Sequence, residues 1–175
     1  MNSIYIYAQG DNFMSIELTH EQKMQRMEQE SFVAGGAFVL KILKEHYGEE
    51  VCHIFAKLQG EKILEDVRKK SEEIEDKSID SYIKLLYEPC LALGNELTIE
   101  KTDEGVQLYC GRCMPHDGAK RHGLVEEGYY IACSTDPYLI EGFNPNIGLK
   151  RTKTKMQGHD CCDHFFYYKD KNKQS

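Results

Sequence analysis

The stretch LTIEKTDEGVQLYC, residues 97–110, contains the change of period that decides the fold. Apolar residues occupy alternate positions on both sides of an Asp-Glu-Gly turn at 103–105; they are Leu97, Ile99, Val106, Leu108 and Cys110. Alternation with a period of two is typical of half-buried β-strands, and a short turn between two such runs predicts a β-hairpin. The chain therefore forms antiparallel sheet from about residue 95 onward.

In residues 19–94, in contrast, the apolar residues recur with the spacing typical of amphipathic helices. Thr19 followed three residues later by Gln22 predicts a capping box, opening a helix that ends near Gly48. Its apolar face is expected to contain Met24, Met27, Phe32, Phe38, Leu40, Ile42 and Leu43. A second helix is expected over 49–75 and a third from 78 or 80 to 94. The inward side chains of the second helix are expected to be Val51, Ile54, Phe55, Leu58, Ile63, Leu64 and Val67.

After the hairpin, short helices are expected over 116–126 and 129–142, and strands over 147–154 and 162–169. No repeat and no linker divides the chain, which predicts one domain over 19–169. Residues 1–18 are interpreted as a loosely ordered lead, in which Met14 is an alternative start, and 170–175 as a polar tail. The predicted fold class is α+β, with a helical N-terminal half packed on a small antiparallel sheet formed mainly by the C-terminal half.

Composition excludes several classes of function. The net charge of −7 argues against a nucleic-acid-binding protein, and the apolar run at 32–40 is too short to span a bilayer. Seven cysteines cannot all pair within the chain, and the N-terminus has no pattern of a secretory signal. These features predict a cytoplasmic protein with free thiols that contacts neither nucleic acid nor membrane. These features are compatible with a homo-oligomer.

The cysteines divide into two groups. Cys52 and Cys90 lie in helical segments and are expected to pack in the core. The others lie around turns of the sheet half, where side chains can converge; they are Cys110, Cys113, Cys133, Cys161 and Cys162. The spacing Cys110-Gly-Arg-Cys113 permits zinc binding, with His116 close by and a second ligand pair available from His159, Cys161, Cys162 and His164. A structural metal is therefore one interpretation.

The stretch GHDCCDHFFYY, residues 158–168, supports a different interpretation. Strand alternation places Cys162 and His164 on one face and Cys161 and Asp163 on the other. A cysteine near a histidine, with a carboxylate to orient that histidine, can act as a nucleophile. The alternative is a buried strand without a catalytic role, in which one cysteine packs in the core and the other has no specific function.

Arg151, in the basic stretch KRTKTK, also has two interpretations. It belongs either to an exposed strand edge or to an inward-facing site, where its guanidinium holds a carboxylate beside the hydroxyl of Thr152 or Thr154.

Several motifs in the last part of the chain resemble one known family. They are Cys133-Ser-Thr-Asp136, Phe143-Asn144-Pro145, Arg151-Thr-Lys-Thr154 and Gly158-His-Asp-Cys-Cys162-Asp163, preceded by Cys113. Together they resemble the L-2-amino-thiazoline-4-carboxylic acid hydrolase family over about 19–168. The chain departs from the family pattern at His159, Cys161 and His164. These departures bear on the identity of the substrate and leave the expected fold unchanged.

The resemblance implies a hydrolase that opens a small cyclic amidine or thiazoline-type carboxylate without a cofactor. It implies catalytic roles for Cys113, Cys133, Cys162, Asp136 and Asp163, and substrate binding by Arg151, Thr152, Asn144 and His159. Cys162 or Cys133 would be the nucleophile, Asp136 or Asp163 the base or orienting carboxylate, and Arg151 the carboxylate anchor. The alternatives are a sensor module holding zinc or iron through Cys113, Cys133 and Cys162, and a scaffold without chemistry of its own.

Overall fold

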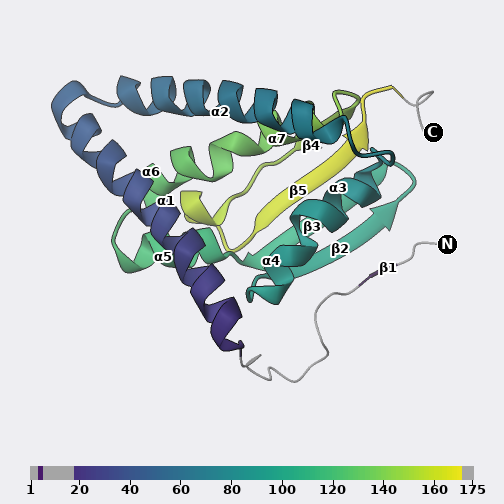
Figure 1. The fold of residues 1–175 in the computed structure, drawn as a ribbon, viewed down its shortest axis with the longest axis horizontal. Helices are drawn as coiled ribbons and strands as arrows, with labels where there is room; N and C mark the ends of the chain where they lie inside the picture. Colours follow the sequence, from purple (N-terminus) through teal and green to yellow (C-terminus); the bar gives the residue numbers. More distant parts are fainter. Residues whose placement is uncertain (1–3, 6–17, 171–175) are drawn as a thin grey trace.

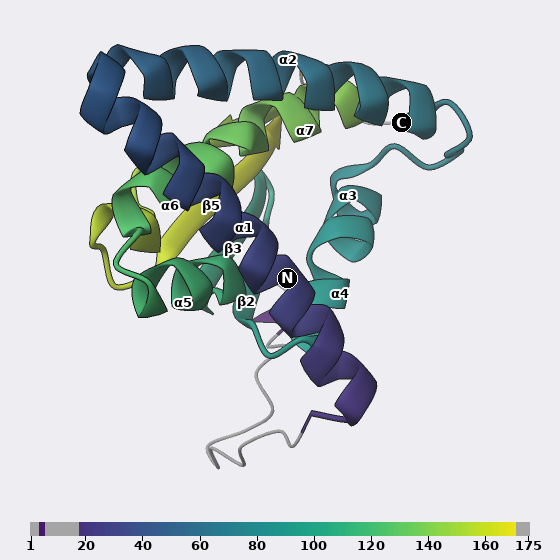
Figure 2. The same cartoon turned by 60° about the vertical axis from the view of Figure 1, so that its left-hand side comes forward.

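The computed structural model describes residues 4–5 and 18–170, and Figure 1 shows the arrangement of their elements. Two long helices, α1 (His20–Tyr47) and α2 (Glu50–Ser71), form the arms of a V that flanks the sheet and the shorter helices (Figures 1 and 2). The sheet is built almost entirely from the C-terminal half. The predicted α+β class is therefore confirmed.

The start of α1 follows from its sequence. The Thr19 hydroxyl accepts a hydrogen bond from the Gln22 amide, and the Gln22 side chain accepts one from the Thr19 amide. This confirms the capping box, which satisfies two backbone N–H groups that the first turn leaves without partners. The helix ends before Gly48, whose φ of 82° lies in the region that glycine tolerates best.

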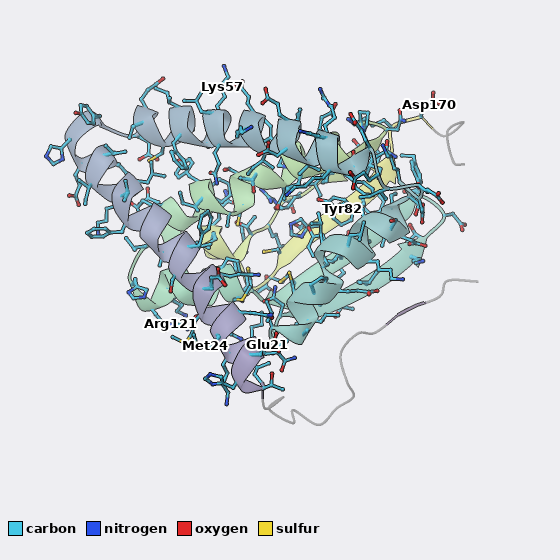
Figure 3. The ribbon with its side chains drawn as sticks, viewed as in Figure 1. Glu21, Met24, Lys57, Tyr82, Arg121 and Asp170 are labelled. Carbon is cyan, nitrogen blue, oxygen red and sulfur yellow. The ribbon has the colours of Figure 1, made fainter. Side chains whose placement is uncertain are left out.

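The apolar face predicted for α1 is confirmed at Leu40 but wrong at most of its other positions. Its expected members Met24, Met27, Phe32, Phe38 and Ile42 are exposed, and Figure 3 labels Met24 near the free N-terminal end of the helix. The buried side is formed instead by Glu30, Val33, Ala34, Ala37 and Leu40. The reason is close approach: a Cβ at Gly118 would lie 2.9 Å from the Glu30 Cβ, so large side chains do not fit on that side.

The inward side predicted for α2 is also wrong at Ile54, Phe55 and Leu58, which are exposed. The helix buries Cys52, Gly60 and Ser71. A Cβ at Gly60 would lie 2.3 Å from the Tyr138 ring, so the glycine lets that ring pack directly on the helix backbone.

The sheet has the strand order β1-β2-β3-β5-β4, and all neighbours are antiparallel. Its strands are β1 (Ile4–Tyr5), β2 (Glu96–Thr102), β3 (Gly105–Arg112), β4 (Ile147–Lys150) and β5 (Cys162–Tyr168). The predicted hairpin is confirmed as β2–β3. Opposite β3, the start of β5 brings Cys110 across from Cys162 and Leu108 across from His164.

One face of the sheet is covered by helices. They include α3 (Ile79–Leu86), α4 (Glu88–Ala92) and α7 (Asp136–Phe143). Tyr82 of α3, labelled in Figure 3, lies 5.5 Å from Phe166 and 5.3 Å from Phe143 between ring centroids. A second core lies between α1 and the helices α5 (Met114–Arg121) and α6 (Val125–Ile131). The predicted burial of Cys52 is confirmed, because it is fully buried in this second core.

The strand predicted over 147–154 is wrong in its second half. The chain leaves the sheet after Lys150, runs irregularly through 151–154, and forms the short helix η2 (Lys155–Gln157) before β5. Tethering to β5, described below, removes this segment from the ladder. Another short helix, η1 (Cys133–Thr135), precedes α7.

The alternative start Met14 and most of the predicted lead and tail lie outside the described residues. Within 4–5 and 18–170, no helix combines the length and apolar character needed to cross a membrane.

Candidate functional site

Four cysteines converge where β3 and β5 meet the shorter helices. Cys110 and Cys162 are opposite each other in neighbouring strands, Cys113 immediately precedes α5, and Cys133 is the first residue of η1. Cys110 lies close enough to Cys113 and Cys162 for these two thiols to change its pKa. Cys133 interacts electrostatically with Cys113 and Cys162. We call Cys110, Cys113, Cys133 and Cys162 the thiol cluster.

Cys162 is the member of the thiol cluster that is best prepared to ionise. A hydrogen bond from Cys110 lowers the pKa of Cys162 and outweighs the opposing effect of burial. The Lys155 backbone N–H also donates to the Cys162 sulfur, at 3.4 Å, and His164 adds favourable electrostatics. These interactions stabilise a thiolate, the form of cysteine that acts as a nucleophile.

Cys110 and Cys133 have the opposite tendency. Hydrogen bonds to Cys113 and Cys162, together with burial, raise the pKa of Cys110, so it keeps its proton. Its sulfur also lies 3.1 Å from the Arg112 carbonyl oxygen. One S–H can serve only one acceptor at a time, and a Cys162 thiolate is the stronger of the two. Burial first, and then Asp136, raise the pKa of Cys133 well above the ordinary value.

A network of charged side chains lies beside the thiol cluster. Asp136, the first residue of α7, forms an ion pair with Nη1 of Arg151 through Oδ2. The same oxygen is 3.3 Å from Nε2 of His164. Nη1 of Arg151 also donates to the Cys133 carbonyl oxygen at 3.0 Å. Arg151 is therefore turned inward, with its side chain only 11% exposed, instead of lying on an exposed sheet edge.

His164 has one ring nitrogen in use and one free. Nε2 faces Asp136, whereas Nδ1 is buried and has no hydrogen-bond partner within the described part of the chain. In the tautomer whose Nε2–H donates a hydrogen bond to Asp136, Nδ1 is unprotonated and can accept a proton. The ring stacks on Phe166 with an interplanar angle of 7°, which fixes its orientation.

Tyr87, between α3 and α4, brings a hydroxyl group to the same region. Its ring lies 5.9 Å from the rings of both His164 and Phe166. Burial first, and then Asp136, raise the pKa of Tyr87 well above its usual value. Tyr87 therefore keeps its proton, and its hydroxyl can donate a hydrogen bond.

Asp163 and Thr152 lie on the other face of β5. Asp163 accepts hydrogen bonds from the Thr152 amide (2.8 Å), the Thr152 hydroxyl (2.6 Å) and the Lys153 amide (2.5 Å). Burial opposes ionisation, yet these bonds lower the pKa of Asp163 below the usual value. The carboxylate thus holds the irregular segment 151–154 against β5, which keeps Arg151 in place.

The structure does not bring Asn144 and His159 into the thiol cluster. The Asn144 side chain donates to the Lys77 carbonyl oxygen at 2.8 Å and accepts from the Asn146 amide at 2.9 Å, so it organises the turn between α7 and β4. His159 is exposed in the turn before β5. Cys90 is half-buried on α4, and its thiol donates to the Leu86 carbonyl oxygen at 3.2 Å.

The metal interpretation gains no support from the geometry. Among residues 4–5 and 18–170, no group of three or more His, Cys, Asp or Glu side chains is arranged to hold a metal ion. His116, the nearest histidine in sequence to Cys113, has Nδ1 3.5 Å from Asp117.

Cys110 and His164 were candidates in the metal and thiol interpretations but are not among the site residues that the resemblance implies, and Tyr87 was not a candidate at all. For His164 a signal existed, because strand alternation places it on the face of Cys162. Cys110 lies on the apolar side of the predicted hairpin, which also indicated an inward thiol. Tyr87 had no such signal, since its helix is joined to the site only by tertiary packing.

The family model described as L-2-amino-thiazoline-4-carboxylic acid hydrolase matches residues 24–166. Neither the curated proteins nor the solved structures provide a match. The matched range covers the thiol cluster, the charged network, all of α2 and α1 from Met24 onward.

Proposed function

The chain belongs to the L-2-amino-thiazoline-4-carboxylic acid hydrolase family, and we propose that it opens the ring of a small thiazoline-type or cyclic amidine carboxylate with Cys162 as nucleophile. One observation carries this proposal: the Lys155 backbone N–H donates to the Cys162 sulfur at 3.4 Å, beside a Cys110 thiol that lowers the pKa of Cys162. Such donors favour the thiolate inside a largely buried site, where an ordinary cysteine would remain protonated.

The ring carbon between nitrogen and sulfur is the electrophile of such a substrate. The Cys162 thiolate attacks this carbon, a carbon–sulfur bond forms, and the tetrahedral centre collapses with cleavage of the ring C–S bond. The ring sulfur leaves as a thiolate and takes up a proton. Water then attacks the same carbon and displaces Cys162, which leaves a carbamoyl group on the product and returns the enzyme to its initial state.

His164 is the proposed general base for the attack by water, and Asp136 is the carboxylate that orients it. The distance of 3.3 Å between Nε2 and the Asp136 carboxylate supports this assignment, because the carboxylate orients the ring and stabilises its protonated form. The free nitrogen Nδ1 would accept the proton. Asp163 has a positioning role in this scheme, because its oxygens bind the segment 151–154.

Arg151 is the proposed anchor of the substrate carboxylate. Its Nη1 is held by Asp136 and the Cys133 carbonyl oxygen, which fixes the direction of the guanidinium plane. A guanidinium has five N–H donors, so its remaining edge can still receive a carboxylate. Cys113 and Cys133 would line the site without acting as nucleophiles, since Cys133 keeps its proton.

Ring opening creates a new thiol, which gives a direct assay. The purified chain is incubated with 2-amino-thiazoline-4-carboxylate and related carboxylates whose ring contains the sulfur, and thiol release is followed with a disulfide chromogen after protein removal. We expect protein-dependent thiol release that Cys162→Ser abolishes and the matched control Cys161→Ser retains. Thiol release that survives in Cys162→Ser would refute the assigned nucleophile. No release by folded protein from any substrate in the panel would refute the proposed reaction.

A further inference from the structure

Cys110 and Cys162 are placed as a disulfide-forming pair. They are directly opposite in the antiparallel β3–β5 ladder, and each is 5% exposed. The Asp163 amide donates to the Lys153 carbonyl oxygen, away from β3, so the backbone groups of Cys162 face β3. A pair of this kind has Cα atoms about 5.5 Å apart, which lies within the usual range for disulfides. The two thiols lie close enough for each to shift the pKa of the other.

The two sulfurs have complementary chemistry. Cys162 is the thiolate that an electrophilic oxidant would attack first, whereas Cys110 is a protonated thiol held against it. Susceptibility to peroxides follows thiolate character, and a second thiol within reach converts the first oxidation product into a disulfide. Cys161 is adjacent in sequence but faces the opposite side of the sheet.

We propose that Cys110 and Cys162 form a reversible disulfide, with Cys110 as the resolving thiol for an oxidised Cys162. The disulfide is a modification site in its own right, and only its expected consequence, the arrest of hydrolysis, rests on the proposed function. Both sulfurs would be linked, which leaves no free thiolate at Cys162 for substrate.

The oxidant is a peroxide, and the steps balance. The Cys162 thiolate attacks one oxygen of hydrogen peroxide, the O–O bond breaks, and hydroxide leaves, so Cys162 becomes a sulfenic acid. The Cys110 sulfur then attacks the Cys162 sulfur, the S–O bond breaks, and the hydroxyl group leaves as water with the proton of Cys110. The released hydroxide takes up the proton that Cys162 lost on ionisation. One peroxide is reduced to two waters, and two thiols are oxidised to one disulfide.

Trypsin separates the competing linkages. Cleavage after Arg112 places Cys110 in peptide 102–112 and Cys113 in peptide 113–120, while Cys162 lies in peptide 156–169. The full-length chain is treated with one equivalent of hydrogen peroxide, its free thiols are alkylated, and the digest is analysed by mass spectrometry. Cys161→Ser serves as matched control, because it leaves Cys162 as the only cysteine of its peptide.

We expect a cross-link between peptides 102–112 and 156–169 in the wild type, in Cys161→Ser and in Cys113→Ser, with complete loss on reduction by dithiothreitol. In Cys110→Ser the cross-link should be lost, and Cys162 should proceed to sulfinic acid. Wild-type protein that shows only a linkage of 102–112 to 113–120, or sulfinic acid at Cys162 with Cys110 still reduced, would overturn the proposal. The wild-type result does not depend on the folding of any variant.

Hydrolysis is measured on portions of the same oxidised protein that are removed before alkylation and digestion. Oxidised wild type should lose thiol-releasing activity and recover it after reduction. A cross-linked but never active protein would contradict the proposed function and leave the disulfide standing. An active protein that forms no cross-link would contradict the disulfide and leave the proposed function standing.

Discussion

The two faces of β5 differ in what their side chains do, although the residues alternate along a single strand. Cys162 and His164 point into the domain, where they meet the thiol cluster and Asp136. Asp163, between them in sequence, points outward and binds the backbone of 152–153. The inner face of the strand therefore carries the reactive groups, and the outer face holds the segment that contains Arg151. Substitutions on the two faces should fail in different ways.

The largest effect is expected for Asp136→Asn on the inner side. Asparagine keeps the size of the side chain but removes the charge that pairs with Arg151 and orients His164. Turnover should fall by about 10²–10⁴, the usual contribution of a positioned acid–base group. Steady-state thiol release measures it, with circular dichroism as the check on folding.

Asp163→Asn is the matched control for this substitution, because it makes the same chemical change on the other face. A loss of turnover in Asp163→Asn as large as in Asp136→Asn would break the distinction between the two faces. It would also return Asp163 to the list of reacting groups.

A smaller loss is expected for Tyr87→Phe. The change removes only the hydroxyl and keeps the ring that packs on His164 and Phe166. Because the ring keeps its packing, stability should change little, while kcat should fall by up to about 10²-fold if the hydroxyl donates to the developing charge. Unchanged kcat with unchanged KM would show that Tyr87 serves packing alone.

The pH dependence of alkylation distinguishes the two adjacent cysteines. The pKa of Cys162 is lowered, so its thiolate forms at lower pH, whereas the pKa of Cys161 is raised, chiefly by burial. The iodoacetamide rate at Cys162 should therefore rise and level off at lower pH than the rate of the same residue in urea-denatured chain. The rate at Cys161 should still be rising there.

Peptide 156–169 contains both cysteines, so each rate is measured in the variant that lacks the other cysteine. Equal profiles for Cys161 and Cys162 would show that the hydrogen bonds from Cys110 and Lys155 do not select a thiolate.

The sequence predicted β5 better than α1, and geometry explains why. A strand has two faces, so alternation alone assigned Cys162 and His164 to the same side. A helix can turn any side toward the core, and in α1 the choice was made by small residues at a close contact with Gly118. The buried Glu30 there is satisfied by Arg26 and Arg121, which lie four and 91 residues away in sequence.

The site was predictable to a similar, limited extent. Motif residues on or near β5 were found because they are close in sequence. Tyr87 was missed because its position depends on how α3 and α4 pack on the sheet. Asn144 was included because it belongs to a motif, but its hydrogen bonds to Lys77 and Asn146 give it a structural role.

The smallest effect on chemistry, and the main effect on stability, is expected from Asp163→Asn. The amide cannot accept as well as the carboxylate from the two backbone N–H groups of 152 and 153 and the Thr152 hydroxyl. Weakening these charge-assisted bonds should lower the free energy of unfolding by about 1–3 kcal/mol. Urea titration at neutral pH measures the loss, and Thr152→Val, which removes only the hydroxyl bond, should cost less.

Acid should erase this difference. The pKa of Asp163 is lower in the folded chain than in the unfolded chain, so ionised Asp163 stabilises the fold above its unfolded pKa. That contribution declines as the pH falls through the unfolded pKa toward the folded one, because the unfolded chain then takes up a proton that the folded chain does not bind. The stabilities of wild type and Asp163→Asn should consequently converge below the ordinary pKa of aspartate, about 3.9. A gap that keeps its size well below that pH would mean that size and shape, instead of the charge of Asp163, hold the segment 151–154 on β5.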